Sequence, residues 1–261
     1  MLIAIKFSGA LITDKSRAYT ARGDLIRRFA SEMRGILNSN SYKSYQFVIV
    51  HGGGSFGHLA AKEMNENPSA LNFCKIQKSM QDLSKIFTDI FIQEGVPVFP
   101  VNLSSSVILK NNKIHKFPGN SLNIIKKLLV LDIVPVTFGV PCIDIETGSG
   151  GGIFSGDEIL VYLSKKLNAD RVISCSITGV IGTDGKPVSE ISQANFPEIF
   201  KALGKSKSVD VTGGMARKVE ELIELAQAGI GSEIVDARDM PLIDIVEGRA
   251  GGTKILPRSK E

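Results

Sequence analysis

Cysteine is scarce in this sequence, and long apolar runs and dense blocks of charge are missing from it. The three cysteines, Cys74, Cys142 and Cys175, are odd in number and far apart, which argues against a disulfide framework and gives no metal-binding spacing. No apolar stretch approaches the ~20 residues that a membrane helix requires. The first residues, MLIAIKFSG, do not resemble a signal peptide. We therefore expect a cytoplasmic protein with no membrane partner.

The charges are mixed and spread along the chain. Lysine and arginine number 31 and aspartate and glutamate 27, which gives a net charge of +4. Without a basic block there is no sign of a nucleic-acid partner, whereas a mild excess of cations suits a small anionic substrate. The length of 261 residues and the hydrophobic content of 43% allow a substantial core.

Three common nucleotide-binding patterns are missing. Neither a Walker GxxxxGK[ST] segment nor the protein-kinase motif set is present. A Rossmann GxGxxG fingerprint is missing too, because residues 52–57 read GGGSFG and no acidic residue stands at the usual downstream position. Nucleotide chemistry, if present, must use another set of residues.

Strands and helices are expected to alternate along the chain. Apolar runs predict strands at 2–7, 47–50, 96–101, 133–138, 171–175, 232–236 and 252–256, the third at an edge. Helical periodicity predicts helices from residue 24 and at 73–90, 121–131, 157–167 and 216–229, and a short one within 192–208. Loops are expected at 11–15, 65–70 and 148–152, a lysine-rich loop shares 192–208 with the short helix, and a polar hairpin or excursion is expected at 102–118.

This alternation predicts an α/β fold with a mostly parallel central sheet and helices on both faces. We expect one domain over residues 1–261. The natural seam lies near 140–155, between an amino-terminal lobe of about 1–150 and a carboxy-terminal lobe of about 151–261.

The segment FVIVHGGGSFGH, residues 47–58, is a short buried-strand pattern that runs into three glycines. Glycine allows close backbone approach, so the turn could wrap its amides around an anion. Ser55 could cap a following helix, and His58 would lie on its first turn. We expect His51 to be structural, hydrogen-bonded near the strand end. The segment alone fits an ordinary tight turn with a surface histidine equally well.

Two further glycine turns carry a charged residue. Lys6 precedes the turn at Ser8-Gly9, and Lys218 follows the one at Gly213-Gly214. In a parallel sheet such turns can share the carboxyl edge of the strands, where ligands bind. Phosphoryl transfer needs backbone amides and cations of this kind, because its transition state spreads negative charge over several oxygens.

Four segments carry a resemblance to known proteins: KFSGALITDK at 6–15, HGGGSFGH at 51–58, GIFSGDEI at 152–159 and DVTGGMARK at 210–218. Together they resemble the amino acid kinase superfamily and, within it, the isopentenyl phosphate kinase family. HGGG alone marks the superfamily, but members that act on acylamino acids or nucleotides lack the second histidine. The resemblance implies the amino acid kinase fold, a homodimer, and ATP-dependent conversion of isopentenyl phosphate to its diphosphate in isoprenoid biosynthesis of the archaeal mevalonate type.

The same resemblance assigns roles to residues. It implies catalytic roles for Lys6, Lys15, His58 and Asp157, acceptor binding by Gly53, His58 and Gly156, and ATP binding by Lys6, Gly9, Gly54, Gly179, Gly214 and Lys218. Lys15 would stabilise the transition state, and His58 would hold the acceptor phosphate in line. Asp157 would orient the lysines, and a Mg²⁺ held through water is a further role that the resemblance allows.

Two departures from the family pattern keep alternatives open. Ser8 stands where the family has glycine, and Ser176 and Thr178 stand where its TDVDG motif has acidic residues. These changes would permit a nucleotide-binding sensor without catalysis, and a kinase of another small phosphate or phosphonate, such as fosfomycin, is the nearest enzymatic alternative. By residue type alone, Lys6 and Lys15 could be surface lysines and Lys218 a helix former.

Two further residue sets have a structural alternative. Asp157 could equally be only a charge that favours a helix amino end. The apolar stripe at Phe73, Ile76, Met80, Leu83 and Phe87 is most simply a core-facing helix side. Its part nearest the glycine turn could instead wall a small hydrocarbon pocket, which would favour a prenyl phosphate over a polar acceptor.

Overall fold

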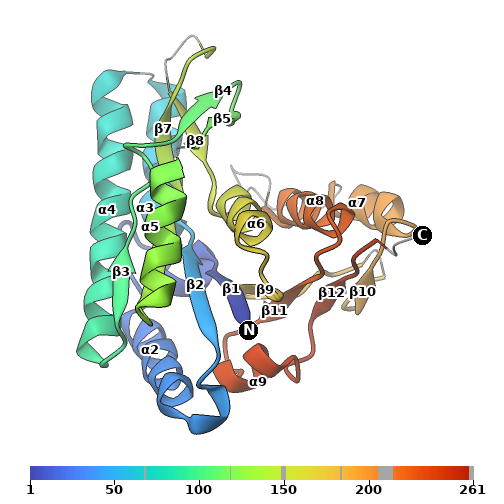
Figure 1. Cartoon of the computed structure of the whole chain (residues 1–261). Helices are drawn as coiled ribbons and strands as arrows, with labels where there is room; N and C mark the ends of the chain where they lie inside the picture. Colours follow the sequence, from blue (N-terminus) through green and yellow to red (C-terminus); the bar gives the residue numbers. More distant parts are fainter. Residues whose placement is uncertain (68, 118, 148–150, 183, 205–213, 259–261) are drawn as a thin grey trace.

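The computed structural model describes residues 1–67, 69–117, 119–147, 151–182, 184–204 and 214–258. An eight-stranded sheet runs through it in the order β10-β12-β11-β9-β1-β2-β6-β3 (Figure 1). Its strands are β1 (Leu2–Phe7), β2 (Gln46–His51), β3 (Val98–Pro100), β6 (Val134–Phe138), β9 (Arg171–Ser176), β10 (Glu190–Ile191), β11 (Ser232–Asp236) and β12 (Thr253–Ile255). Neighbouring strands are parallel except β11 and β12. The prediction of a mostly parallel sheet with β3 at its edge is confirmed.

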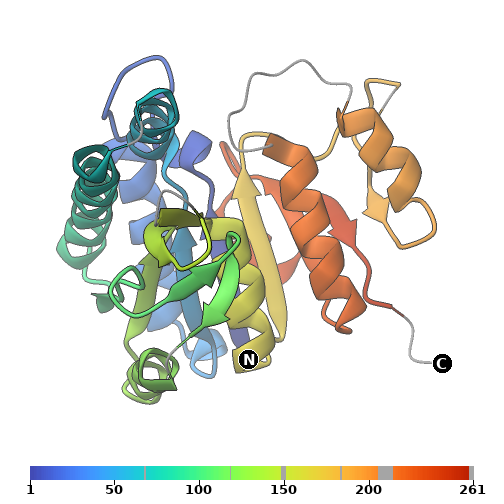
Figure 2. The ribbon, with the colours of Figure 1, turned by 90° about the horizontal axis from the view of Figure 1, so that it is seen from above.

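Helices cover both faces of this sheet. The helices are α1 (Gly9–Ile12), α2 (Gly23–Asn38), α3 (Gly54–Glu66), α4 (Ala70–Gln93), α5 (Gly119–Val130), α6 (Gly156–Leu167), α7 (Phe196–Gly204), α8 (Gly214–Gln227) and α9 (Leu242–Glu247), with a short 3-10 turn at Asn40–Tyr42. Apolar residues of α5, α6 and α8 pack in one core, and those of α2, α9 and most of α4 pack in the other. Figure 2, seen from above, shows α4 (teal) on the left and α7 and α8 (orange) on the right, near the carboxyl terminus.

The central strand β1 shows why two cores form. We call the core that contains α2, α9 and most of α4 the α2 core, and the core that contains α5, α6 and α8 the α6 core. Side chains alternate across a strand, so Ile3, Ile5 and Phe7 lie in the α2 core while Ala4 lies in the α6 core. Lys6 is two residues after Ala4, so its side chain lies on the same face of the strand, toward α6. Because β1 lies between β2 and β9, the carboxyl ends of these three strands meet at one edge of the sheet.

A second sheet of four strands is a feature that the sequence did not predict in full. It has the order β5-β4-β7-β8, with β4 (Ile108–Lys110), β5 (Lys113–Lys116), β7 (Val140–Asp144) and β8 (Gly151–Phe154). The hairpin expected at 102–118 is confirmed by the antiparallel pair β4–β5. The loop expected at 148–152 is wrong at Gly151 and Gly152, which pair with β7, whereas 148–150 lie outside the described residues. Glycine fits there because an added Cβ at Gly151 would lie 2.4 Å from the Phe73 ring.

Several predicted boundaries are also corrected. Residues 11–15 were expected as a loop, but Leu11 and Ile12 belong to α1, because both are buried in the α2 core. Residues 65–70 were expected as a loop, but α3 continues to Glu66 and α4 begins at Ala70, capped by the Ser69 hydroxyl, which accepts from the N–H of Asn72. Of the short helix and lysine-rich loop expected within 192–208, the helix is α7, and residues 205–208 lie outside the described residues.

Two bulk features of the described chain agree with its composition. All three cysteines are free; Cys74 is exposed, and Cys142 and Cys175 are buried. Burial raises the pKa of both buried thiols to about 12, so they are inert at neutral pH. Among the described helices, none combines the length and the apolar character that a membrane crossing requires.

Candidate active site

Lys6 lies near the end of β1 as a buried cation with a partly buried partner. It is 4% exposed, and its Nζ lies 2.5 Å from Oδ2 of Asp157 in the first turn of α6. A Cβ at Gly156 would lie 3.2 Å from Cε of Lys6, so the glycine leaves room for the lysine. The prediction that Asp157 opens this helix is confirmed: Ser155 and Glu158 form a capping box around it. The pair therefore lies at a helix amino end.

Asp157 remains ionised although it is largely buried. Burial alone would raise the pKa of this carboxyl, but the charges of Lys6 and then Lys218 outweigh burial and lower it below its usual value. Its Oδ1 is buried without a hydrogen-bond partner among the described residues. The carboxylate thus holds Lys6 with one oxygen and keeps the other as a buried acceptor.

The glycine turn after β2 presents backbone donors. The helix α3 begins at Gly54, which adopts a φ of +47°, with Gly53 as its cap residue. The expectation that Ser55 caps this helix is wrong: its N–H donates to Oγ1 of Thr13, and its own hydroxyl contacts Thr20. The N–H groups of Gly53 and Gly54 donate to no acceptor in the described part of the chain. Two open donors at the positive end of a helix make a site for an anion.

The turns after β1 and β2 are in direct backbone contact. A Cβ added at Gly9 would lie 2.0 Å from the nitrogen of Gly54, so no larger residue fits. Thr13, which is fully buried, joins the two turns because its hydroxyl donates to the Gly9 carbonyl at 2.7 Å while accepting from Ser55. Sequence reasoning missed Thr13, since its role depends on which helix lies opposite it.

Ser8, the first departure from the family pattern, fits this turn without strain. Its φ of −63° and ψ of 147° are ordinary extended values. Its N–H donates to the carbonyl of Cys175 on β9 at 2.9 Å, and its hydroxyl is buried without a partner among the described residues. The side chain thus adds a second buried polar group close to the glycine turns.

Lys15 and His58 lie on segments that are tied to the same turn. His58 is half-buried and starts the second turn of α3, rather than the first. Lys15 is exposed in the segment between Thr13 and Ala21, which form a bridge. The same segment is held against α3 by the Thr20 N–H, which donates to the hydroxyl of Ser55 at 3.2 Å. The fold therefore brings the Lys15 segment to the amino end of the helix that carries His58.

Lys218 reaches the end of β9 from α8. It is 7% exposed and donates to the hydroxyl of Ser176 at 3.1 Å, at one of the two positions where the family motif has an acid. The helix starts at Gly214 with a φ of +52°, and residues 210–213 of its motif, which include Gly213, lie outside the described residues. Because Lys218 also lowers the pKa of Asp157, two lysines lie close to this one carboxylate.

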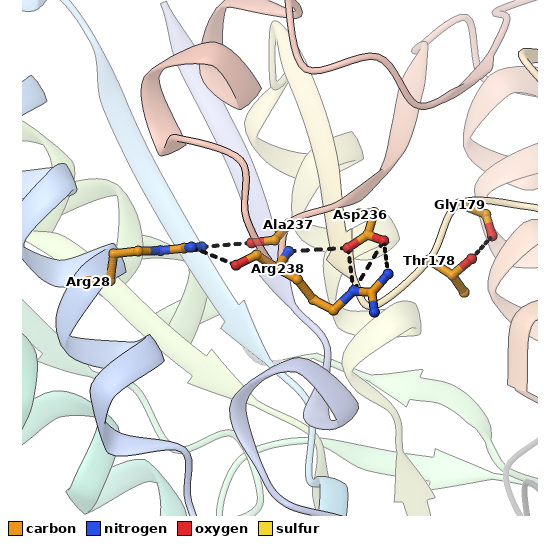
Figure 3. A network of polar contacts seen from close by, with 6 residues as sticks. All are labelled: Arg28, Thr178, Gly179, Asp236, Ala237 and Arg238. Carbon is orange, nitrogen blue, oxygen red and sulfur yellow. Dashed lines mark hydrogen bonds and ion pairs between the residues drawn. The ribbon is translucent and has the colours of Figure 1, made fainter.

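The loop after β9 and the end of β11 form the rest of this edge. Gly179 follows Thr178, whose hydroxyl donates to its carbonyl, and a Cβ at Gly179 would lie 3.4 Å from Oγ1 of Thr253 on β12. Asp236 ends β11 level with Ser176, and Arg238 pairs with it through two guanidinium nitrogens (Figure 3). That pairing lowers the pKa of Asp236. The Asp236 carboxylate thus lies one strand away from Ser176 and Thr178, the positions where the family motif has acidic residues. In the sequence, only the position of Asp236 at the end of a predicted strand could have indicated it.

The backbone that follows Asp236 is held by hydrogen bonds from a side chain of α2. Arg28 on α2 donates to the carbonyls of Ala237 and Arg238 at 2.7 and 2.6 Å (Figure 3). Hydrogen bonds from a charged donor hold a turn more firmly than neutral ones. Arg28 therefore fixes the backbone that carries the Asp236–Arg238 pair.

The apolar stripe of α4 is divided between the two cores. Leu83 and Phe87 pack with Phe7 and Phe29, so they are ordinary core, whereas Ile76 and Met80 pack on the α6 side. A Cβ at Gly53 would lie 2.8 Å from Sδ of Met80, so this methionine borders the glycine turn. A cavity of about 280 Å³ lies beside the outer part of α4. It is lined by Phe73, Cys74, Gln77, Lys78, Gln81, Ser104, Pro141 and Ile143.

Comparison with known proteins agrees with this geometry. The isopentenyl phosphate kinase of Methanocaldococcus jannaschii is 31% identical over 84% of this chain and 86% of its own length, and that of Haloferax volcanii is 34% identical over 86% and 88%. Solved X-ray structures of isopentenyl phosphate kinase include one with a TM-score of 0.78 at 27% identity, covering 98% of this chain and all of the other. A carbamate kinase from Giardia lamblia bound to AMP-PNP shares the fold, with a TM-score of 0.67 at 15% identity and 98% of both chains covered. The model of the amino acid kinase family matches residues 1–236, and the chain belongs to this family.

Proposed function

We propose that this protein is an isopentenyl phosphate kinase, which transfers the γ-phosphoryl group of ATP to isopentenyl phosphate in isoprenoid biosynthesis. An oxygen of the acceptor phosphate attacks the γ-phosphorus, the bond to the β-phosphate oxygen breaks, and isopentenyl diphosphate and ADP leave. The observation that carries the proposal is the glycine cradle, in which the open N–H donors of Gly53 and Gly54 lie on the turn that packs against the Lys6 strand.

The residues divide the work according to where they lie. Gly53 and His58 bind the acceptor phosphate, with Gly156 beside them, and Gly54 and Gly9 approach the transferring group. Lys6, paired with Asp157, neutralises negative charge as it develops, and Lys15 does so from the exposed segment.

ATP lies on the side of α8. Lys218 and Gly214 contact its phosphates, and Gly179 lies along the nucleotide. This division makes residues of about 1–150 the acceptor side and those of about 151–261 the nucleotide side of a single domain. Lys218 is anchored for this role by its hydrogen bond to Ser176 on β9.

The residues present fit a magnesium ion that arrives with ATP. Mg²⁺ at kinase sites usually keeps several waters and uses one or two carboxylates together with substrate phosphates. Within the described residues no group of three or more metal-binding side chains gathers, so a dedicated protein cage is not what supports the ion. The unpartnered Oδ1 of Asp157 is the acceptor that could hold it through water. When bound, the ion would neutralise charge on the phosphates.

Selectivity for the hydrocarbon tail is assigned to the part of α4 next to the cradle. Met80, which is 3% exposed, borders Gly53 and lies in the same core as Ile76 and Phe154. Burial of a five-carbon tail at about 0.8 kcal/mol per CH₂ contributes roughly 3–4 kcal/mol over a bare phosphate. Polar acceptors gain nothing from such a wall.

An ADP-release assay over a panel of acceptors tests the proposal. Isopentenyl phosphate should give a much higher kcat/KM than fosfomycin, carbamate, UMP or acetylglutamate, and Met80→Ala should admit longer prenyl phosphates. Leu83→Ala is the matched control, because Leu83 on the same helix packs in the other core. A polar acceptor that outruns isopentenyl phosphate would leave only the family assignment standing, and ATP binding without any turnover would favour a nucleotide sensor.

Assembly and location complete the proposal. We expect a cytoplasmic homodimer, as the family resemblance implies. On the second sheet, the apolar side chains of Ile143 and Ile153 are 55% and 39% exposed. Exposed apolar side chains of this kind support a surface for contact with a second copy of the chain. Light scattering of the purified protein gives the mass in solution, and a monomer at micromolar concentration would contradict the dimer.

A further inference from the structure

His51, the last residue of β2, is a buried polar side chain that the proposed chemistry does not use. It is fully buried, and its ring stacks between Phe87 of α4 at 5.2 Å and Phe138 of β6 at 5.1 Å between ring centroids. Burial lowers the pKa of His51 to about 4, so the ring is neutral at physiological pH. No role in contact with a ligand is open to it.

One ring nitrogen is bonded to the cradle itself. Nδ1 lies 3.2 Å from the carbonyl oxygen of Gly52, which can only accept, so Nδ1 carries the proton. The other nitrogen, Nε2, is buried without a hydrogen-bond partner among the described residues. A buried polar atom without a partner costs stability, and a phenylalanine would stack between the same rings without that cost. The histidine is therefore poorly explained by packing.

The bonded carbonyl belongs to the same peptide unit as the N–H of Gly53. In a planar trans peptide the C=O and the N–H point in opposite directions. A carbonyl held toward His51, inside the core, directs the Gly53 N–H away from the core. The preceding peptide is fixed independently, because the Gly52 N–H donates to the Phe7 carbonyl at 2.9 Å and the His51 carbonyl accepts from Gly139. Three glycines in a row would otherwise leave this peptide free to rotate.

We infer that His51 is a positioning residue: its Nδ1–H fixes the Gly52–Gly53 peptide so that the Gly53 amide is aimed at the acceptor phosphate. The inference rests on the proposed function, which places the acceptor at Gly53. It concerns the orientation of a backbone donor, and His51 itself touches no substrate.

Two variants separate the hydrogen bond from the stacking. His51→Phe keeps an aromatic ring between Phe87 and Phe138 but has no donor. His51→Asn has an amide nitrogen near the place of Nδ1 but no ring. His51→Phe should lower kcat/KM for isopentenyl phosphate by about three- to tenfold, the factor that one net hydrogen bond represents. His51→Asn should retain more activity although it is the less stable variant, and KM for ATP should change in neither.

His51→Asn should thus be the more active but less stable variant, and His51→Phe the less active but more stable one. If His51 served only in packing, activity would follow stability instead. If His51→Phe is as active as the wild type, or if activity follows the unfolding midpoint across the variants, the inference is wrong. Nitrogen-15 NMR of the histidine rings gives a readout that needs neither substrate nor a well-folded variant. It should show the Nδ1–H tautomer for His51 in the wild type, and an Nε2–H tautomer would overturn the inference. If the wild type fails to use isopentenyl phosphate while the Nδ1–H tautomer is present, the substrate proposal fails and the anchored peptide remains.

Discussion

Asp157→Asn tests how much the stability of the folded protein depends on the ion pair between Lys6 and Asp157. The Lys6 side chain is 5% exposed and that of Asp157 22%, with Nζ and Oδ2 2.5 Å apart. Removing one partner of a buried ion pair costs roughly 3–5 kcal/mol, because the other charge is left uncompensated. Since Asp157 is partly accessible, we expect the low end, about 3 kcal/mol of unfolding free energy. That loss corresponds to a fall in Tm of roughly 6–12 °C for a chain of this size.

Asp82→Asn is the matched control. Lys78 and Asp82 are 2.6 Å apart, but their side chains are 75% and 51% exposed, and they stand four residues apart on α4. An exposed pair of this kind contributes only about 0.3–0.5 kcal/mol. Urea unfolding of both variants and the wild type, without ligand at neutral pH, measures the difference. Asp157→Asn losing no more stability than Asp82→Asn would refute the argument that Lys6 depends on this carboxylate.

The difference in unfolding free energy between the wild type and Asp157→Asn should depend on pH in a defined direction. The folded-state pKa of Asp157 lies below the usual value of 3.8, so its carboxylate stabilises the folded state in full above that value. The stabilisation is lost as the pH falls through the lower folded-state pKa. The gap between the wild type and Asp157→Asn should therefore be constant from about pH 5 to 8 and close only in acid below 3.8.

Two further predictions concern His58 and the two lysines Lys6 and Lys15. His58→Ala should lower turnover by a factor equivalent to roughly 2.7–4 kcal/mol while ATP binding, measured by calorimetry, stays near normal; His58→Gln should lose less, and the exposed His115→Ala on β5 is the control. Near-normal turnover of His58→Ala would remove this histidine from the mechanism. Lys6→Met and Lys15→Met should each depress kcat more than they raise KM, and a pure KM effect would reduce that lysine to ground-state binding. Lys6→Met should also lower the unfolding midpoint, because it removes the ion-pair partner of Asp157.

The sequence determined the fold class, because its evidence is local. Apolar runs such as 47–50 and the helical stripe from residue 24 follow from burial of one strand or one helix face, whatever lies opposite. The glycine turn at 52–54 and the first-turn position of Asp157 were likewise readable, since each depends on the conformation of its own segment. The resemblance in four ordered segments then gave the family.

Other features could not be read from the sequence, because each depends on contacts with a segment that is distant in the sequence. Gly151 and Gly152 form a strand only because β7 offers a partner and Phe73 leaves no room for a side chain. The stripe of α4 was visible, but the two cores that divide it were not. Ser55 was expected to cap α3, but it lies inside the helix, and its hydroxyl accepts from the N–H of Thr20, 35 positions away.

The chemistry of the site was decided by tertiary structure for the same reason. Lys6 is by type a surface residue, and it becomes a buried cation because β1 delivers it beside Asp157, 151 positions later in the chain (157 − 6). His51 is hydrogen-bonded at the strand end, as expected, but the rings that stack on it, Phe87 and Phe138, come from other elements. The sequence determined which groups are present. Their pKa values, open donors and orientations arose only when distant segments removed water from them and supplied the charges and hydrogen bonds that replaced it.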